Sequence, residues 1–175
     1  MPLYYDEFSD LPVDWPMILV GWRGFAGKKL SAGQVIACAI EQIGKGTSEQ
    51  DEVAALLANT DLLAWQTIDR YLEQLAGEMD RELSLRKWRL AELEHLIPTL
   101  EPSSALANVD DDEDEECYDV FFALVVFWVS YNDDLPIDAE MMPNFGETIE
   151  QMLSKQQAWA EREEAALRGE IGARP

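Results

Sequence analysis

The sequence predicts an all-α protein in which five to seven helices pack around a central apolar helix. Apolar residues recur at steps of three and four along several stretches, which is typical of amphipathic helices. Those stretches begin at capping residues and end at glycine or proline. Ten consecutive apolar residues, 120–129, form the expected central helix, and an α+β fold that uses this run as a strand is the alternative.

The first two helices are marked by their caps. Asp14 can cap a helix that runs to about Trp22, with Pro16 in its first turn. Ser31 can cap a second helix that ends at Gly44. The apolar face expected on this second helix consists of Val35, Ile36, Ala39, Ile40 and Ile43.

Helices are also expected through the middle of the chain. Ser48 can cap a short third helix, and a long helical region is expected from Thr60 to Pro98 with a break at Gly77. Its apolar residues at helical steps are Trp65, Ile68, Leu72, Leu75 and Met79, then Leu85, Trp88, Leu90, Leu93 and Ile97. The basic residues expected on a solvated face beside Glu residues are Arg81, Arg86, Lys87 and Arg89.

The last part of the chain combines a loop with a final helix. Residues 98–116 show no periodicity, and a helix that ends at Gly169 is expected further on. The apolar face of that helix consists of Ile149, Met152, Leu153, Gln156 and Trp159. We expect a single helical domain over residues 1–175, with a flexible acidic loop at 102–116 and a loose tail at 170–175.

Charge is distributed unevenly along the chain. Thirteen basic and 35 acidic residues give a net charge of −22, and residues 109–146 carry 12 acidic residues but no Lys or Arg. Such a surface repels nucleic acid and anionic membranes and attracts cationic molecules. The sequence therefore favours a basic protein partner over nucleic acid or a membrane, and it leaves the oligomeric state open.

The cysteines and the apolar runs indicate a cellular location. Cys38 and Cys117 lie far apart without a Cys-x-x-Cys companion, so neither a disulfide framework nor a zinc site is expected. The first residues lack the basic and apolar segments of a signal peptide. The longest apolar run has ten residues, about half of what a membrane span needs. A cytoplasmic location is expected.

Motifs for catalysis are weak. Glu92 and His95 form one Glu-x-x-His motif, but a di-iron bundle needs two, and His95 is the only histidine. Residues 21–29, GWRGFAGKK, look like a phosphate loop but lack the glycine and the Ser or Thr that it requires. Cys38 falls on an apolar helical stripe and is expected in the core. We expect no catalytic residue, no cofactor and no enzymatic activity.

Seven consecutive carboxylates, Asp110–Glu116, precede the apolar run. An EF-hand loop that starts at Asp110 needs Gly at its sixth position and Glu at its twelfth, where this chain has Glu115 and Phe121. No specific metal site is therefore expected, although clustered carboxylates bind divalent cations weakly.

Three interpretations of the acidic run stay open. Glu115, Glu116 and Asp119 can stabilise the positive end of the following helix, at roughly 0.3–1 kcal/mol each. The run can also simply keep a flexible loop solvated. In the third interpretation it belongs to an acidic face that binds a cationic partner. The candidate partner-binding residues are Asp110, Asp111, Asp112, Glu113, Asp114, Glu115, Glu116, Asp133, Asp134, Asp138 and Glu140.

Residues 13–43, VDWPMILVGWRGFAGKKLSAGQVIACAIEQI, share their pattern with a known family. The pattern is Trp15, an apolar stretch ending at Gly21, a short polar turn, Leu30 and Ser31, and then an amphipathic helix containing alanine. With looser similarity in RKWRLAELEHL and DDLP, the chain resembles uncharacterised bacterial helical proteins assigned as immunity proteins of polymorphic-toxin systems. The resemblance covers about half of the chain, implies stoichiometric inhibition and brings no catalytic residues.

The sequence thus predicts a non-enzymatic acidic binding protein, an immunity or inhibitor protein that neutralises a basic toxin domain by stoichiometric binding. An acidic surface accelerates association with a cationic partner and can occlude a site that binds phosphate. Two alternatives stay open. One is a carboxylate-based, metal-dependent hydrolase, and the other is a structural or regulatory subunit that binds through apolar surface.

Overall fold

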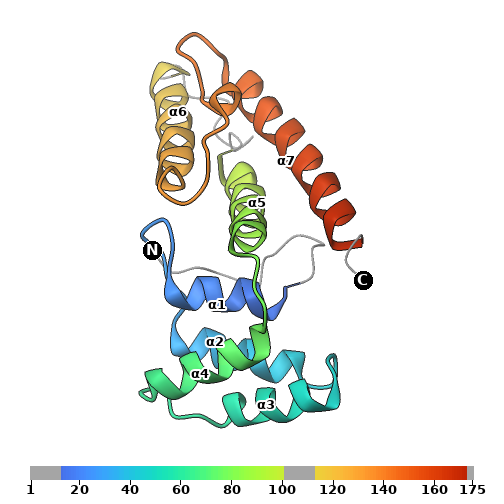
Figure 1. The fold of residues 1–175 in the computed structure, drawn as a ribbon. Helices are drawn as coiled ribbons and strands as arrows, with labels where there is room; N and C mark the ends of the chain where they lie inside the picture. Colours follow the sequence, from blue (N-terminus) through green and yellow to red (C-terminus); the bar gives the residue numbers. More distant parts are fainter. Residues whose placement is uncertain (1–12, 101–112, 173–175) are drawn as a thin grey trace. The chain divides into compact units, whose positions relative to one another are not determined.

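The computed structural model describes residues 13–100 and 113–172. Within those ranges the chain forms seven α-helices and one short 3₁₀-helix, and no strand (Figure 1). The all-α prediction is therefore confirmed, and residues 120–129 are helical. The chain divides into two compact units between Leu85 and Arg86, within helix α5. We call them the N-terminal unit and the C-terminal unit and describe each by itself.

Four helices make up most of the N-terminal unit: α1 (Trp15–Arg23), α2 (Ala32–Gln42), α3 (Ser48–Ala58) and α4 (Trp65–Ala76). Helix α1 packs on α2 and α4, and α3 also packs on α2 and α4. Each of the four helices therefore has two neighbours on which to bury its apolar face. The fully buried side chains include Ile18, Val35, Leu57, Ile68 and Leu72.

Capping side chains explain where the first three helices begin. The Asp14 carboxylate accepts a hydrogen bond of 3.0 Å from the backbone of α1, as predicted. Ser31 and Gln34 form a capping box at the start of α2, which also confirms the predicted cap. Helix α3 is capped by Thr47 and not by Ser48, because Thr47 forms a second capping box one residue earlier.

Helix α4 begins at Trp65 and not at the predicted Thr60. The Asp61 carboxylate accepts a hydrogen bond of 2.8 Å from the Leu63 N–H, which holds the preceding residues in a turn. Gly77 ends α4 with φ of 58°, in agreement with the predicted break.

The segment after α1 is a tight turn rather than a phosphate loop. Phe25 and Lys28 exchange backbone hydrogen bonds of 3.0 and 2.7 Å, and the two corner residues, Ala26 and Gly27, have φ of 49° and 71°. Positive φ at both corners is what a type I′ turn requires. Gly24 has φ of 91°, and a Cβ there would lie 3.0 Å from the Lys28 carbonyl oxygen, so this position needs glycine.

The C-terminal unit is built from the larger part of α5 (Arg81–Leu100), α6 (Glu113–Ser130), the 3₁₀-helix η1 (Ala139–Met141) and α7 (Ile149–Gly172). Helix α7 packs on α6 and on η1. Helix α5 continues past Pro98, where we predicted its end. The proline lies in the last turn, so the one bond that its missing N–H removes and the clash of its ring disturb only the end of the helix.

Helix α6 begins inside the range in which we predicted a loop. Of that range, 102–116, the last four residues form the start of α6, and residues 102–112 lie outside the described part of the chain. Carboxylates in a first turn are stabilised by the helix dipole, which favours an early start.

Helix α7 is also longer than predicted. It passes Gly169 and reaches Gly172, so the first three residues of the expected tail are helical, and residues 173–175 lie outside the described part. One glycine costs a helix only about 1 kcal/mol, which packing elsewhere along α7 can offset.

Tryptophan dominates the core of the C-terminal unit. Trp88 and Trp128 are completely buried, and Trp159 is buried beside Trp128 with 5.0 Å between ring centroids in an edge-to-face arrangement. The apolar stripe predicted over residues 85–97 is buried throughout, which confirms it.

Candidate functional site

Helix α6 has two different apolar faces. The inner face is buried and consists of Val120, Leu124, Phe127 and Trp128. The outer face is exposed and consists of Tyr118, Phe122, Val126 and Val129, of which 54%, 57%, 66% and 51% is exposed. We call these four residues the α6 stripe. A central helix, as predicted for residues 120–129, should be buried on every side, and the exposed outer face shows that this expectation is wrong.

The residues of the α6 stripe follow one another at steps of four, four and three. Such steps place them on one side of a helix, one above the other. Single exposed apolar residues are common on proteins, but a contiguous group of large ones marks a surface that contacts another molecule. Fully burying an aromatic or branched side chain stabilises by about 1.5–3 kcal/mol, and about half of that is still to be gained at each of these positions.

The loop before α7 adds an aromatic ring beside this surface. Phe145 is 79% exposed and stacks on Phe121, with ring centroids 4.5 Å apart and an interplanar angle of 24°. Phe121 also meets Phe122 of the stripe edge-to-face at 5.6 Å. The exposed aromatic surface therefore continues from α6 onto the loop.

Acidic residues lie at both ends of the α6 stripe. Residues 113–116 form the first turn of α6, and Asp119 is exposed one turn further on. At the other end Asp133 is exposed, and Asp134 half-buried, directly after the helix. Because α6 has 18 residues, the two acidic groups are about 25 Å apart.

Of the predicted partner-binding residues that the structure describes, 113–116 lie at one end of α6 and Asp133 and Asp134 follow its other end. Asp110, Asp111 and Asp112 lie outside the described residues. Asp138 caps η1, where its carboxylate accepts a hydrogen bond of 3.1 Å from the Glu140 N–H. This gives Asp138 a local structural role, whereas Glu140 itself is exposed.

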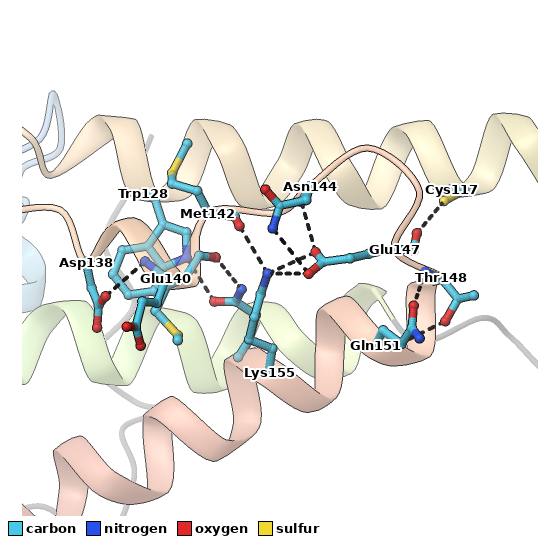
Figure 2. Close-up of polar contacts among 12 residues, drawn as sticks. Cys117, Trp128, Asp138, Glu140, Met142, Asn144, Glu147, Thr148, Gln151 and Lys155 are labelled. Carbon is cyan, nitrogen blue, oxygen red and sulfur yellow. Dashed lines mark hydrogen bonds and ion pairs between the residues drawn. The ribbon is translucent and has the colours of Figure 1, made fainter.

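A network of polar contacts fixes the loop that carries Phe145. Figure 2 shows Lys155 of α7 pointing toward the loop, where it donates to the Met142 carbonyl at 3.0 Å and to the Glu147 carboxylate at 2.8 and 2.9 Å. Glu147 also accepts a hydrogen bond of 2.9 Å from the Asn144 N–H. Phe145 therefore projects from a loop that is held on both sides.

The pKa of Glu147 reflects this network. Burial alone would raise the pKa, but the hydrogen bonds from Lys155 and Asn144 outweigh burial, so the pKa of Glu147 lies below its ordinary value. The carboxylate is thus charged in the folded protein, and its negative charge is already compensated by Lys155.

Two further contacts connect this loop with the helices. Thr148 and Gln151 bond each other's backbone N–H groups at 3.2 and 2.9 Å and so begin α7, and Cys117 of α6 donates to the Glu147 carbonyl at 3.7 Å (Figure 2). These contacts hold the start of α7 against α6.

A completely buried glutamine joins α6, η1 and α7. Gln156 accepts a hydrogen bond of 2.8 Å from the Trp128 indole N–H and donates one of 2.8 Å to the Met141 carbonyl. The sequence placed Gln156 correctly on the inner face of α7. It did not indicate why a polar residue lies in the core. The structure gives the reason, because the buried Trp128 indole N–H and the Met141 carbonyl both need a hydrogen-bond partner.

Two of the four residues in the basic cluster on α5 are buried, against our expectation of a solvated face. Arg89 is only 8% exposed and donates to the Pro136 carbonyl at 3.1 Å, and Lys87 is 2% exposed. The Arg89 guanidinium lies 5.4 and 5.0 Å from the ring centres of Trp128 and Trp159. Burial lowers the pKa of Arg89, and the nearby charge of Glu163 opposes that effect.

Arg86 on the same helix fits the expectation of paired charges better. It bonds Glu163 of α7 through two N–H groups at 2.7 and 3.2 Å, and Glu170 at 2.7 Å. The hydrogen bonds that Arg86 donates to Glu163 outweigh burial, and the pKa of Arg86 is raised. These bonds attach α5 to α7 within the C-terminal unit.

The Glu-x-x-His motif lies on α5. Glu92 accepts a hydrogen bond from the buried Tyr131 hydroxyl, and burial, followed by the charge of Glu92, raises the pKa of Tyr131. His95 is exposed on the same helix. In the part of the chain that the structure describes, no three His, Cys, Asp or Glu side chains are grouped to hold a metal ion.

No described helix combines the length and apolarity needed to cross a membrane.

The N-terminal unit also exposes apolar side chains, but in another setting. Leu63 is 82% exposed before α4, and Trp65 packs against Trp22 with 4.9 Å between ring centroids. The Lys29 ammonium lies 4.8 and 4.6 Å from the centres of the Trp22 and Trp65 rings. Here a cation already covers aromatic surface, whereas no Lys or Arg occurs on α6 or in the loop that follows it.

Comparison with known families places the chain. Residues 5–164 match the family described as "Uncharacterized protein conserved in bacteria (DUF2247)", and the protein belongs to this family. The description agrees with the bacterial, uncharacterised family that residues 13–43 resemble, and it assigns no activity. No curated protein and no solved structure matches the chain.

Proposed function

We propose that this protein acts by stoichiometric binding of a basic protein, in the manner of an immunity protein that neutralises a toxin domain. The observation that carries the proposal is the α6 stripe, which is an exposed apolar surface. It lies within residues 109–146, which contain 12 acidic residues and no Lys or Arg. The resemblance of residues 13–43 to immunity proteins supports the same conclusion.

The two components of this surface have separate roles in binding. Protein interfaces combine an apolar, aromatic centre with a polar rim, and the buried centre supplies most of the affinity. Charge at the rim steers the partner and raises the association rate, and it excludes partners of the same sign. The α6 stripe would be the centre of such an interface, and the acidic groups at its two ends would be the rim.

A basic toxin domain is the partner that this arrangement fits. A domain that acts on nucleic acid carries a cationic surface for phosphate groups. An acidic protein that occupies this surface blocks the substrate directly, so inhibition needs no chemistry from the inhibitor. One inhibitor molecule would therefore be consumed for each toxin molecule.

The test begins with the protein encoded by the adjacent gene. Co-expression of both proteins should restore growth that the neighbour alone abolishes, and light scattering should give a one-to-one complex. Affinity measured by titration calorimetry at 50 and 500 mM NaCl should fall with salt, because screening shortens the reach of surface charges.

A variant with Asp110–Glu116 replaced by Asn and Gln separates the acidic run from the rest of the surface. Slower association of this variant would assign the run to steering, whereas an unchanged rate would remove the run from the mechanism. A neighbour that is not toxic, or a complex that leaves its activity intact, would overturn the proposed function.

A further inference from the structure

We propose that the α6 stripe is the docking face for an amphipathic helix of the partner, whose apolar side is bounded at both ends by Lys or Arg. The biological identity of this helix rests on the proposed function, but the binding preference itself does not. The proposal concerns the class of partner and the face that receives it.

The length and spacing of the stripe fit a helix. From Tyr118 to Val129 the stripe rises by about 16 Å, which is three helical turns. Its steps of four, four and three repeat the pattern by which one helix presents anchors to another. A partner helix of about 16 residues would cover the four side chains and extend past the stripe at both ends.

The aromatic residues beside α6 give this face a boundary. Phe145 stacks on Phe121, and Phe121 meets Phe122, so the exposed Phe145 ring and the half-buried Phe121 ring border the stripe. The loop that carries Phe145 is fixed by the contact of 2.8 Å between Lys155 and Glu147. A partner therefore meets a surface whose aromatic edge is already in place, which lowers the entropy lost on binding.

The charges at the two ends of α6 favour a different protein over a second copy of this chain as the molecule that binds the α6 stripe. Both ends of α6 are acidic, at residues 113–116 and Asp119 and again at Asp133. Two α6 helices packed face to face would bring carboxylates against carboxylates in the parallel and in the antiparallel orientation alike. A helix with Lys or Arg at both ends would instead meet opposite charge at each end.

The described cations nearest to this region are already engaged. Residues 109–146 contain no Lys or Arg, Arg89 is buried and donates to the Pro136 carbonyl, and Lys155 is held by Glu147 and the Met142 carbonyl. A partner with Lys or Arg at both ends would therefore bring the charge that complements the exposed carboxylates of Asp119 and Asp133.

The test uses three synthetic helical peptides of 16 residues. The first has apolar residues at steps of four, four and three with two lysines at each end, the second has glutamates in place of the lysines, and the third has the composition of the first in scrambled order. Binding to the full-length protein is measured by fluorescence anisotropy, and the contact face is identified by NMR of the ¹⁵N-labelled protein.

We expect the lysine peptide to bind and to shift the amide resonances of residues 118–129. Its affinity should fall at least tenfold between 50 and 500 mM NaCl, and the other two peptides should bind at least tenfold more weakly. Equal binding of the lysine and glutamate peptides would overturn the charge argument, and shifts confined to other helices would overturn the assignment of the face.

A double variant with Phe122→Ser and Val126→Ser should lose at least tenfold in affinity for the lysine peptide. The control is Leu63→Ser, which changes a still more exposed apolar residue of the N-terminal unit and should bind normally. Because 57% of Phe122 and 66% of Val126 is exposed, the two changes remove only partial burial, and the melting temperature of the double variant should fall by no more than about 6 °C. A clearly larger drop in melting temperature would mean that another part of the chain already covers the stripe, and would overturn the proposal.

Analytical ultracentrifugation of the protein alone tests whether a second copy of this chain occupies the α6 stripe instead. Self-association that the double variant abolishes would assign the stripe to a second copy and overturn the proposal. The two proposals also fail separately. Peptide binding without protection from a toxin would overturn only the proposed function, and full protection by the double variant would overturn only the docking face.

Discussion

Two arginines, one in each unit, show how differently the two units use the same side chain. In the N-terminal unit Arg23 lies on the surface, 43% exposed, where it bonds Asp69 at 3.2 Å through two N–H groups and also bonds Glu73. In the C-terminal unit Arg89 is buried between aromatic rings and donates to a backbone carbonyl. The surface pair adds little to stability, whereas the buried cation cannot be removed without rearranging its surroundings.

The difference extends beyond these two residues. The described contacts of the N-terminal unit combine an apolar core with caps and exposed ion pairs, while the C-terminal unit buries a polar set formed by Arg89, Gln156 and Tyr131. Buried polar groups demand specific partners, since an unpaired one is costly. We therefore expect substitutions to separate the two units by the size of their effects.

The largest effect is expected for Arg89→Ala. Loss of the Pro136 contact and of the packing on Trp128 and Trp159 should lower the free energy of unfolding by roughly 2–4 kcal/mol. Urea denaturation followed by tryptophan fluorescence measures this change. The matched control is Arg89→Met, which keeps the apolar stem and should cost less. A loss below 1 kcal/mol for Arg89→Ala would contradict the role assigned to this residue.

The next largest effect is expected for Gln156→Leu. It leaves the Trp128 indole N–H and the Met141 carbonyl without their buried partner. The free energy of unfolding should fall by roughly 2–3 kcal/mol. Hydrogen exchange should locate the change in the C-terminal unit, with the amides of α2 and α3 unaffected. Uniform loss of protection in both units would show that they unfold together.

A smaller, pH-dependent effect is expected at the contact of Glu147 with Lys155. The pKa of Glu147 is lowered in the folded protein, so its contribution is present above its unfolded-state pKa of about 4.3 and is lost as the pH falls through the lowered folded value. Glu147→Gln should cost about 1–2 kcal/mol at pH 7 and much less at pH 3.

Lys155→Met serves as the partner for a double-mutant cycle at this contact. The coupling energy between the two sites should be measurable at pH 7 and absent at pH 3. A coupling that persists at pH 3 would show that the ion pair is not its source.

The smallest effect is expected for Arg23→Ala. Its ion pairs with Asp69 and Glu73 are exposed, so the free energy of unfolding should change by less than about 1 kcal/mol. The hydrogen bonds with Asp69 and then with Glu73 raise the pKa of Arg23, but solvent screens most of that effect. A loss as large as that of Arg89→Ala would remove the contrast between the two arginines.

The sequence determined which stretches are helical and where the first two helices begin. Asp14 and Ser31 are capping residues whose side chains satisfy the first free N–H groups locally, so their neighbours in the sequence are enough to place them. The buried apolar side of α5 over residues 85–97 could also be predicted from the sequence, because apolar residues at helical steps are expected to face a core. The acidic residues of 109–146 and the absence of Lys and Arg there are likewise evident from the sequence alone.

Tertiary structure alone decided which side of α6 is buried and why certain polar residues lie inside. A continuous apolar run looks the same on every face, so nothing in residues 120–129 separates Phe122, which is exposed, from Trp128, which is not. The burial of Arg89 and Gln156 depends on rings and carbonyl groups brought in from other helices. Local preferences fix where a helix forms, but only its neighbours fix what it must bury and what it leaves exposed for another molecule.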